Sequence, residues 1–168
     1  INGSSAIPPT PSASSTSPVC EGQSVTLNGD NTASGQTTGN VYLWEGPGGY
    51  TSAAQQPTIP IIDDTNDGNY TLTVTNQFSC YETATTLVYF NENPTLNLLS
   101  QTNVLCNGEF SGAYTIEVTN PIPFGNYLYN AGAAVNFDGI FNDVGAGAYN
   151  VEVTDDNSCS YTIPVKIT

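Results

Sequence analysis

Apolar and polar residues alternate in short stretches along the first half of the chain, and polar turn residues separate these stretches. The stretches are rich in β-branched and aromatic residues, which suit the pleated and half-buried surface of a sheet. They occupy residues 24–27, 41–44, 57–61, 70–74 and 84–90. Gly, Asn, Asp and Pro recur between them about every ten residues. This spacing predicts an all-β sandwich.

The second half of the chain repeats the same plan. Strands are expected at residues 113–118, 126–130, 134–137, 148–153 and 161–167. The strand pattern breaks at Pro94, which separates a domain at 19–94 from a domain at 95–168. Leucines follow Pro94 at once, so we expect a stiff junction. Residues 1–18 are rich in Pro, Ser and Thr, and we expect them to form a linker or an extended strand.

Two distant segments carry nearly the same motif. Residues 68–80 read GNYTLTVTNQFSC, and residues 147–159 read GAYNVEVTDDNSC. Each half also contains a Cys-x-Gly triplet, at residues 20–22 and 106–108. Because internal repeats reveal the architecture of a chain, the sequence predicts two divergent copies of one module.

The glycine–tyrosine pairs in this motif predict the type of sandwich. Gly68 and Tyr70 fit the start of a strand whose tyrosine hydroxyl bonds back to the preceding crossover, and Gly147 with Tyr149 repeats the glycine–tyrosine motif in the second half. This arrangement, the tyrosine corner, is typical of immunoglobulin-like domains. Both halves are therefore expected to be immunoglobulin-like β-sandwiches.

The core of the first module fits this prediction. Leu27 and Leu72 stand where an antibody domain carries its two disulfide cysteines, and Trp44 lies between them in sequence. An antibody domain places its core tryptophan on the corresponding strand. The sandwich pattern is therefore kept without the disulfide in the core.

The chain contains four cysteines, Cys20, Cys80, Cys106 and Cys159. No CxxC motif and no histidine accompanies them, which argues against a zinc site. Four cysteines allow three pairings, and sequence alone does not choose between them. Their spacing parallels the repeat and favours one disulfide in each module, Cys20–Cys80 and Cys106–Cys159. Each closed loop would contribute about 4 kcal/mol, and disulfides indicate an oxidising, extracellular setting.

This pairing meets one difficulty. In a plain immunoglobulin topology the start of the second strand, beside Cys20, and the end of the sixth strand, beside Cys80, lie at opposite ends of the sandwich. The bond would need the segment before the second strand to run along the sandwich, or a modified topology.

Both modules resemble repeats of bacterial surface proteins. The first, with SPVCEGQSVTL, VYLWEGPGGYTS and DGNYTLTVTNQFSC, resembles immunoglobulin-like repeats of very large proteins exported by the gliding-associated secretion system. The second, with VLCNGEFSGAYTIEV and GAYNVEVTDDNSC, resembles the repeat of gliding-motility adhesins. The likeness covers about residues 8–168, although the first module departs from the adhesin pattern at Thr75 and Asn76. It implies a tandem-repeat, cell-surface and non-enzymatic role, and it implies no particular ligand.

The charge balance excludes several classes of protein. The chain has one Lys, no Arg, no His and fifteen acidic residues, for a net charge of -14. Binding to nucleic acids or anionic membranes requires basic side chains, so both classes are excluded. No apolar run is long enough for a membrane-spanning helix, and the first residues lack the pattern of a signal peptide.

Catalysis is not expected either. Without histidine, and with a single lysine in the last expected strand, only carboxylates such as Asp138 and Asp143 could act as acid and base. Both lie in turn-like segments, where acidic residues are ordinarily solvated. The sequence therefore predicts a protein that is not an enzyme and that needs no cofactor.

Calcium is the one metal that the sequence could accommodate. The candidate ligands are Asp63, Asp64, Asp67, Asp155 and Asp156, in two acidic turns. Calcium prefers oxygen ligands from such loops, but the spacing does not match the calcium-binding loop of an EF-hand. The turn of the tyrosine corner already explains Asp67.

Aromatic residues around a glycine-rich turn offer a candidate glycan contact. Tyr42 and Tyr50 flank the segment WEGPGG, and exposed rings stack on sugars. Trp44 is expected in the core instead.

The sequence thus favours a structural or adhesive module of a bacterial cell-surface protein, whose partners are neighbouring repeats, copies of itself or surface glycans. A second hypothesis is a subunit of an extracellular filament, in which residues 1–18 add a strand to the sheet of a neighbour. A third is a glycan- or calcium-dependent binding module.

Overall fold

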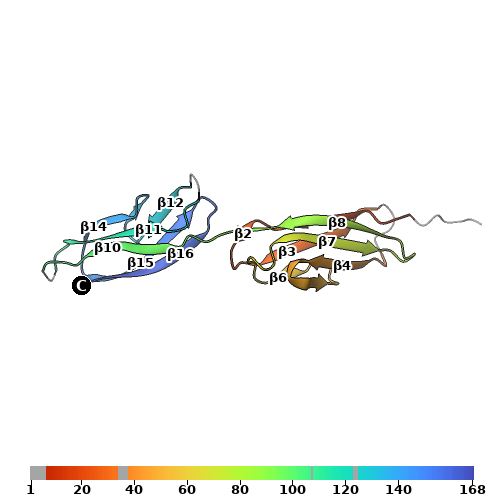
Figure 1. The fold of residues 1–168 in the computed structure, drawn as a ribbon, viewed down its shortest axis with the longest axis horizontal. Coiled ribbons are helices and arrows are strands. Elements are labelled where there is room, and N and C mark those ends of the chain that lie inside the picture. Colours follow the sequence, from red (N-terminus) through yellow and green to blue (C-terminus); the bar gives the residue numbers. More distant parts are fainter. Residues whose placement is uncertain (1–6, 34–37, 107, 123–124) are drawn as a thin grey trace, which may run out of the picture. The chain divides into compact units, whose positions relative to one another are not determined.

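The computed structural model describes residues 7–33, 38–106, 108–122 and 125–168. Across these residues the chain forms β-strands, one short 3-10 helix η1 (Pro47–Gly49) and no α-helix. Contacts divide the chain into two compact units, Ile1–Asn91 and Glu92–Thr168 (Figure 1). In the described part of the chain, no helix has the length and apolar character needed to span a membrane.

The first unit is a sandwich of two antiparallel sheets. Its strands are β1 (Pro11–Ser15), β2 (Val19–Cys20), β3 (Val25–Asn31), β4 (Val41–Gly46), β5 (Tyr50–Ser52), β6 (Thr58–Ile59), β7 (Gly68–Thr75), β8 (Tyr81–Val88) and β9 (Phe90–Asn91). One sheet has the order β1-β3-β6, and the other has the order β5-β4-β7-β8. The short strands β2 and β9 form a separate parallel pair.

Alternation along the strands builds the core of this unit. In β7 the buried side chains are Tyr70, Leu72 and Val74, and the residues between them are partly exposed. Successive side chains of a strand point to opposite faces, so one face of β7 packs inward. The buried cluster consists of Val25, Leu27, Trp44, Ile59, Ile62, Tyr70, Leu72, Val74 and Val88.

The second unit repeats this architecture. Its strands are β10 (Leu96–Thr102), β11 (Gly112–Val118), β12 (Tyr127–Asn130), β13 (Val135–Asn136), β14 (Ile140–Val144), β15 (Gly147–Asp155) and β16 (Ser160–Ile167). The sheets have the orders β10-β11-β14 and β13-β12-β15-β16. The buried cluster consists of Tyr114, Ile116, Tyr129, Phe141, Val151, Val153, Val165 and Ile167. The two units therefore share one strand order, with β1 corresponding to β10 and β8 to β16.

Hydrogen bonds also match at the start of each unit. The Thr10 amide donates to Asn31 Oδ1 at 2.8 Å, and the Thr95 amide donates to Asn120 Oδ1 at 2.6 Å. Thr10 and Thr95 are therefore equivalent positions, each just before the first strand of its unit.

Residues 11–15 of the Pro/Ser/Thr-rich segment belong to the first sandwich. They form β1, which pairs antiparallel with β3 from Pro11 opposite Asn31 to Ser15 opposite Leu27. Residues 1–6 of this segment lie outside the described residues. The strand-addition hypothesis assumed that the segment has no partner of its own, and β1 has one.

Candidate functional site

The first unit has the predicted tyrosine corner, and the second unit has the equivalent contact. Tyr70 is fully buried, and its hydroxyl donates to the Asn66 carbonyl at 2.7 Å. The Tyr149 hydroxyl donates to the Gly145 carbonyl at 2.9 Å. Gly68 has φ 127°, a conformation that favours glycine. Each corner thus ties the start of a long strand, β7 or β15, to the crossover before it.

The aromatic residues near the glycine-rich turn are part of the core packing. Trp44 has no exposed surface, and its Nε1 donates to the Gln55 carbonyl at 3.3 Å. Tyr42 and Tyr50 are partly buried and pack against the first core. The Tyr50 ring meets the Tyr70 ring edge-on, with centroids 5.3 Å apart. A glycan contact at Tyr42 and Tyr50 stays a prediction.

The first acidic turn is held by its own side chains. Asp63 Oδ1 accepts hydrogen bonds from the Thr65 hydroxyl at 2.6 Å and the Thr65 amide at 2.9 Å. These two bonds lower the pKa of Asp63 below its ordinary value. Asn66 Oδ1 accepts from the Asp63 amide at 3.0 Å. The structure thus gives Asp63 a role in shaping the turn before the tyrosine corner.

Asp138 and Asp156, the residue directly after β15, also accept hydrogen bonds from nearby groups. Asp156 Oδ2 accepts from the Asn126 amide at 2.9 Å, and Asp138 Oδ1 accepts from the Ile140 amide at 3.0 Å. Among the described residues, no group of three or more His, Cys, Asp and Glu side chains could hold a metal ion. Calcium binding by Asp63, Asp64, Asp67, Asp155 or Asp156 stays a prediction.

The predicted cysteine pairing is wrong. Cys80 and Cys106 are free thiols, whereas Cys20 and Cys159 are disulfide-bonded. Each predicted pair, Cys20–Cys80 and Cys106–Cys159, contains one free cysteine, so neither unit contains the disulfide of its own that the spacing suggested.

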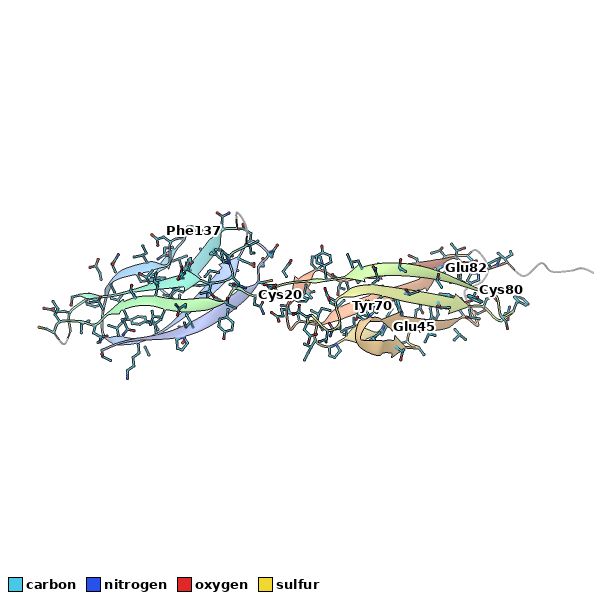
Figure 2. All side chains as sticks on the ribbon, in the orientation of Figure 1. Cys20, Glu45, Tyr70, Cys80, Glu82 and Phe137 are labelled. Carbon is cyan, nitrogen blue, oxygen red and sulfur yellow. The ribbon has the colours of Figure 1, made fainter. Side chains whose placement is uncertain are left out.

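The sheet topology of the first unit explains the error. Cys20 lies in β2 opposite Asn91, beyond the last residue of β8, while Cys80 directly precedes Tyr81, the first residue of β8. The eight residues of β8 span roughly 25 Å, and a disulfide joins Cα atoms about 4.4–6.8 Å apart. Figure 2 shows Cys20 and Cys80 at opposite ends of this unit.

The second unit has the same arrangement. The Val104 amide, two residues before Cys106, donates to the Thr168 carbonyl at 3.2 Å, just after β16. Cys159 directly precedes Ser160, the first residue of β16. The eight residues of β16 again separate the two cysteines by roughly 25 Å. The difficulty raised by a plain immunoglobulin topology is therefore real in both units.

Cys80 ends a tight turn between β7 and β8. Asn76 Oδ1 accepts from the Phe78 amide at 2.9 Å and from the Cys80 amide at 3.1 Å. The Asn76 amide donates to the Cys80 carbonyl at 2.9 Å, and the Ser79 amide donates to the Asn76 carbonyl at 3.0 Å. Ser79 has φ 63°. We call residues 76–80 the first cysteine turn.

Residues 155–159, the second cysteine turn, reproduce this hydrogen-bond pattern. Asp155 Oδ1 accepts from the Asn157 and Cys159 amides, both at 2.8 Å. The Asp155 amide donates to the Cys159 carbonyl at 2.9 Å, and the Ser158 amide donates to the Asp155 carbonyl at 3.0 Å. Ser158 has φ 66°. Cys80 and Cys159 thus occupy the same local structure.

The two Cys-x-Gly turns also match. The Gln23 amide donates to the Cys20 carbonyl at 3.1 Å, and the Glu109 amide donates to the Cys106 carbonyl at 3.2 Å. The glycines of the two triplets, at positions 22 and 108, have φ 82° and 88°. Cys20 and Cys106 therefore also occupy equivalent places.

A small apolar cavity in the second unit was not expected from the sequence. It has a volume of about 190 Å³, and Phe110, Tyr114, Phe141 and Tyr149 are among its lining residues. Phe110 itself is 70% exposed. The one signal in the sequence is an aromatic residue two positions after the second Cys-x-Gly triplet.

Comparisons with known proteins bear on the fold. No family model matches the sequence, and no curated protein matches it. The insect immune protein hemolin is 10% identical, with a TM-score of 0.51, over 100% of this chain and 48% of the hemolin chain.

Two further solved structures are similar over most of this chain. The N-terminal domains of the outer capsid protein Hoc of bacteriophage RB49 are 17% identical over 95% of this chain and 59% of theirs, with a TM-score of 0.44. Murine CEACAM1b is 14% identical over 95% of this chain and 99% of its own, also with a TM-score of 0.44. The chain thus spans about half the length of hemolin and of the Hoc fragment. The topology and the likeness to hemolin show that the chain has an immunoglobulin-like, all-β fold.

Proposed function

We propose that the chain is a non-enzymatic, extracellular structural module of a bacterial cell-surface protein, similar to the repeats of gliding-motility adhesins. The observation that carries the proposal is the repetition itself. Two units share one strand order, and they share the same hydrogen bonds in their cysteine turns, Cys-x-Gly turns and tyrosine corners. Repetition of a whole module suits a spacer or stalk, in which length is the useful property.

The side-chain chemistry supports the same role. The chain has no histidine and a single lysine, and several of its carboxylates hold turns together. A disulfide suits an oxidising compartment outside the cytosol. Partners are then expected to be further modules of the same kind, and adhesion would use exposed side chains on the sandwiches.

A structural module must resist extension. Single-molecule pulling on the two ends of the chain, with a reductant present, tests this requirement. We expect two separate force peaks, each followed by a length gain of roughly 200–300 Å as one unit unravels. A unit that extends without a force peak would contradict a role in resisting mechanical force.

Two matched core variants assign the peaks. Leu72 and Val153 are fully buried, one in each core. Leu72→Ala is expected to weaken only the peak of the first unit, and Val153→Ala only that of the second, because truncation of a buried side chain leaves a cavity. Weakening of both peaks by one variant would mean that the units do not bear load separately.

A further inference from the structure

Each free thiol of the chain occupies the same local structure as a disulfide-bonded cysteine. Cys80 ends a cysteine turn, as the bonded Cys159 does, and Cys106 begins a Cys-x-Gly turn, as the bonded Cys20 does. The largest difference between corresponding hydrogen bonds is between 3.1 Å at the Cys80 amide and 2.8 Å at the Cys159 amide. Each free cysteine therefore has the local backbone structure of a disulfide-bonded cysteine: Cys80 that of Cys159, and Cys106 that of Cys20.

The chain has two kinds of cysteine, those of the Cys-x-Gly turns and those of the cysteine turns. One disulfide-bonded cysteine is of the first kind and the other is of the second. The free cysteines are again one of each kind. Within any one unit the two kinds lie about one eight-residue strand apart, too far to bond to each other. A cysteine of either kind thus needs its counterpart from another unit.

We propose that Cys80 and Cys106 are the two complementary ends of a head-to-tail disulfide chain. Cys106 of one molecule bonds to Cys80 of the next, so that the partner is a second copy of this chain or another module of the same kind. The inference rests on the proposed structural function, and it names the partner and the covalent link of that function.

Both thiols are accessible for this chemistry. Cys106 is exposed, and Cys80 is partly exposed. The molecules carry a net charge of -14, so copies repel each other at low ionic strength, and salt at physiological concentration screens this repulsion beyond about 8 Å. Linking should therefore proceed faster at moderate than at low salt.

The bond forms by thiol–disulfide exchange with a small disulfide such as oxidised glutathione. The Cys106 thiol loses its proton, and its thiolate attacks one sulfur of the small disulfide, which releases one small thiolate. The Cys80 thiolate of a second molecule then attacks the Cys106 sulfur of the mixed disulfide and releases the other small thiolate. The two released thiolates take up the two protons, so two protein thiols are oxidised and one small disulfide is reduced.

The test uses the full chain and two single variants, Cys80→Ser and Cys106→Ser. Each variant keeps one free thiol of a single kind. After incubation with oxidised glutathione, we expect the unmodified chain to give a ladder of covalent multimers on a non-reducing gel. Each variant alone should remain mainly monomeric. An equimolar mixture of the variants should give about tenfold more dimer than either variant alone and nothing larger.

Mass spectrometry identifies the bond. Because the chain has one lysine, cleavage at acidic residues replaces trypsin, and the linked peptide should contain Cys80 and Cys106. Circular dichroism confirms that both variants are folded. The unmodified chain with its thiols blocked by iodoacetamide gives a second control that needs no substitution.

Three outcomes would overturn the proposal. The single variants could dimerise alone as readily as the mixture does, which would mean that pairing is indiscriminate. The unmodified chain could lose both thiols while it stays monomeric, or it could end as a glutathione adduct that never links. The pulling experiment is independent of these results, since it is done under reducing conditions, so a failure here leaves the proposed function standing.

Discussion

The first residue of the cysteine turn is Asn76 in one unit and Asp155 in the other. In both, Oδ1 accepts two backbone hydrogen bonds, but the remaining side-chain atoms differ. Asn76 Nδ2 donates to the Ile7 carbonyl at 2.9 Å. Asp155 Oδ2 is buried and has no hydrogen-bond partner among the residues that the structure describes. Because a buried polar atom without a partner is costly, the second unit loses stability at this residue.

Exchanging these residues between the units tests that cost. Ile7 lies three residues before Thr10, and Glu92 lies three residues before the equivalent Thr95. The Glu92 carbonyl is therefore the expected acceptor for a side-chain amide at position 155. We expect Asp155→Asn to raise the free energy of unfolding at neutral pH by about 1–2 kcal/mol, and Asn76→Asp to lower it by about 1–3 kcal/mol.

Urea unfolding at pH 7 measures both changes. Asn157→Asp, at an exposed position in the second cysteine turn, is the control and should change stability by less than about 0.5 kcal/mol. A loss of stability in Asp155→Asn would show that the carboxylate is better accommodated than its missing hydrogen bond suggests.

At the scale of elements, strand β4 ends where it packs on the tyrosine corner. Gly46, its last residue, has an extended backbone with φ -158°, which any residue can adopt. A Cβ at this position would collide with ring atoms Cδ1 and Cε1 of Tyr70. Glycine is therefore required by the close approach of the ring and not by the backbone conformation.

Gly46→Ala should consequently destabilise the first unit. We expect a loss of about 1–3 kcal/mol, because the extra methyl group displaces the Tyr70 ring and strains its hydroxyl contact with Asn66. Thermal unfolding under reducing conditions should show the transition of the first unit shifted and that of the second unit unchanged. Val41→Ala, 64% exposed on the same strand, is the control. Equal shifts in both transitions would contradict this assignment.

The sequence predicts the strands best where apolar and polar residues alternate strictly. Residues 70–74 and 148–153 lie inside β7 and β15, since a period of two identifies a half-buried strand directly. Strand β1 has the sequence PSASS, which lacks β-branched and aromatic residues. Its strand conformation comes from pairing with β3, which no local pattern reveals.

The spacing of the cysteines does not predict their pairing, because the pairing depends on the ends of the sandwich. The repeat correctly marks which cysteines are equivalent, but equivalence says nothing about the distance between the two cysteines of one unit. That distance depends on β2 pairing with β9 beyond the end of β8. The cavity beside Phe110 was missed for a similar reason, since its walls come from separate strands and turns.

At the scale of the whole molecule, both cores contain tyrosine. Tyr70 lies in the first core, and Tyr114 and Tyr129 lie in the second. Burial raises the pKa of each above its ordinary value of 10.0. The chain has no histidine, the side chain that ordinarily titrates between about pH 5 and 8. The pH dependence of stability should therefore appear mainly in alkali.

The shifted pKa values determine how folding stability changes with pH. In the unfolded chain these tyrosines lose their protons near pH 10, whereas in the folded chain they keep them to higher pH. Their contribution is thus complete below the unfolded pKa and is lost as the pH rises through the folded pKa. In acid, the lowered pKa of Asp63 means that its contribution is lost as the pH falls below its ordinary value of 3.8. This loss is small because Asp63 is well solvated.

We therefore expect the melting temperature to be nearly level from about pH 5 to 8 and to fall steeply above about pH 10. Thermal unfolding at a series of pH values across this range measures the melting temperature.

Tyr70→Phe should have a lower melting temperature at pH 7, because the Asn66 carbonyl loses its donor. The melting temperature of its first unit should, however, fall less steeply in alkali. Tyr81→Phe, at a residue 67% exposed, should leave both the melting temperature and the slope unchanged. An undiminished alkaline slope in Tyr70→Phe would mean that ionisation of this buried tyrosine does not limit the stability of its unit.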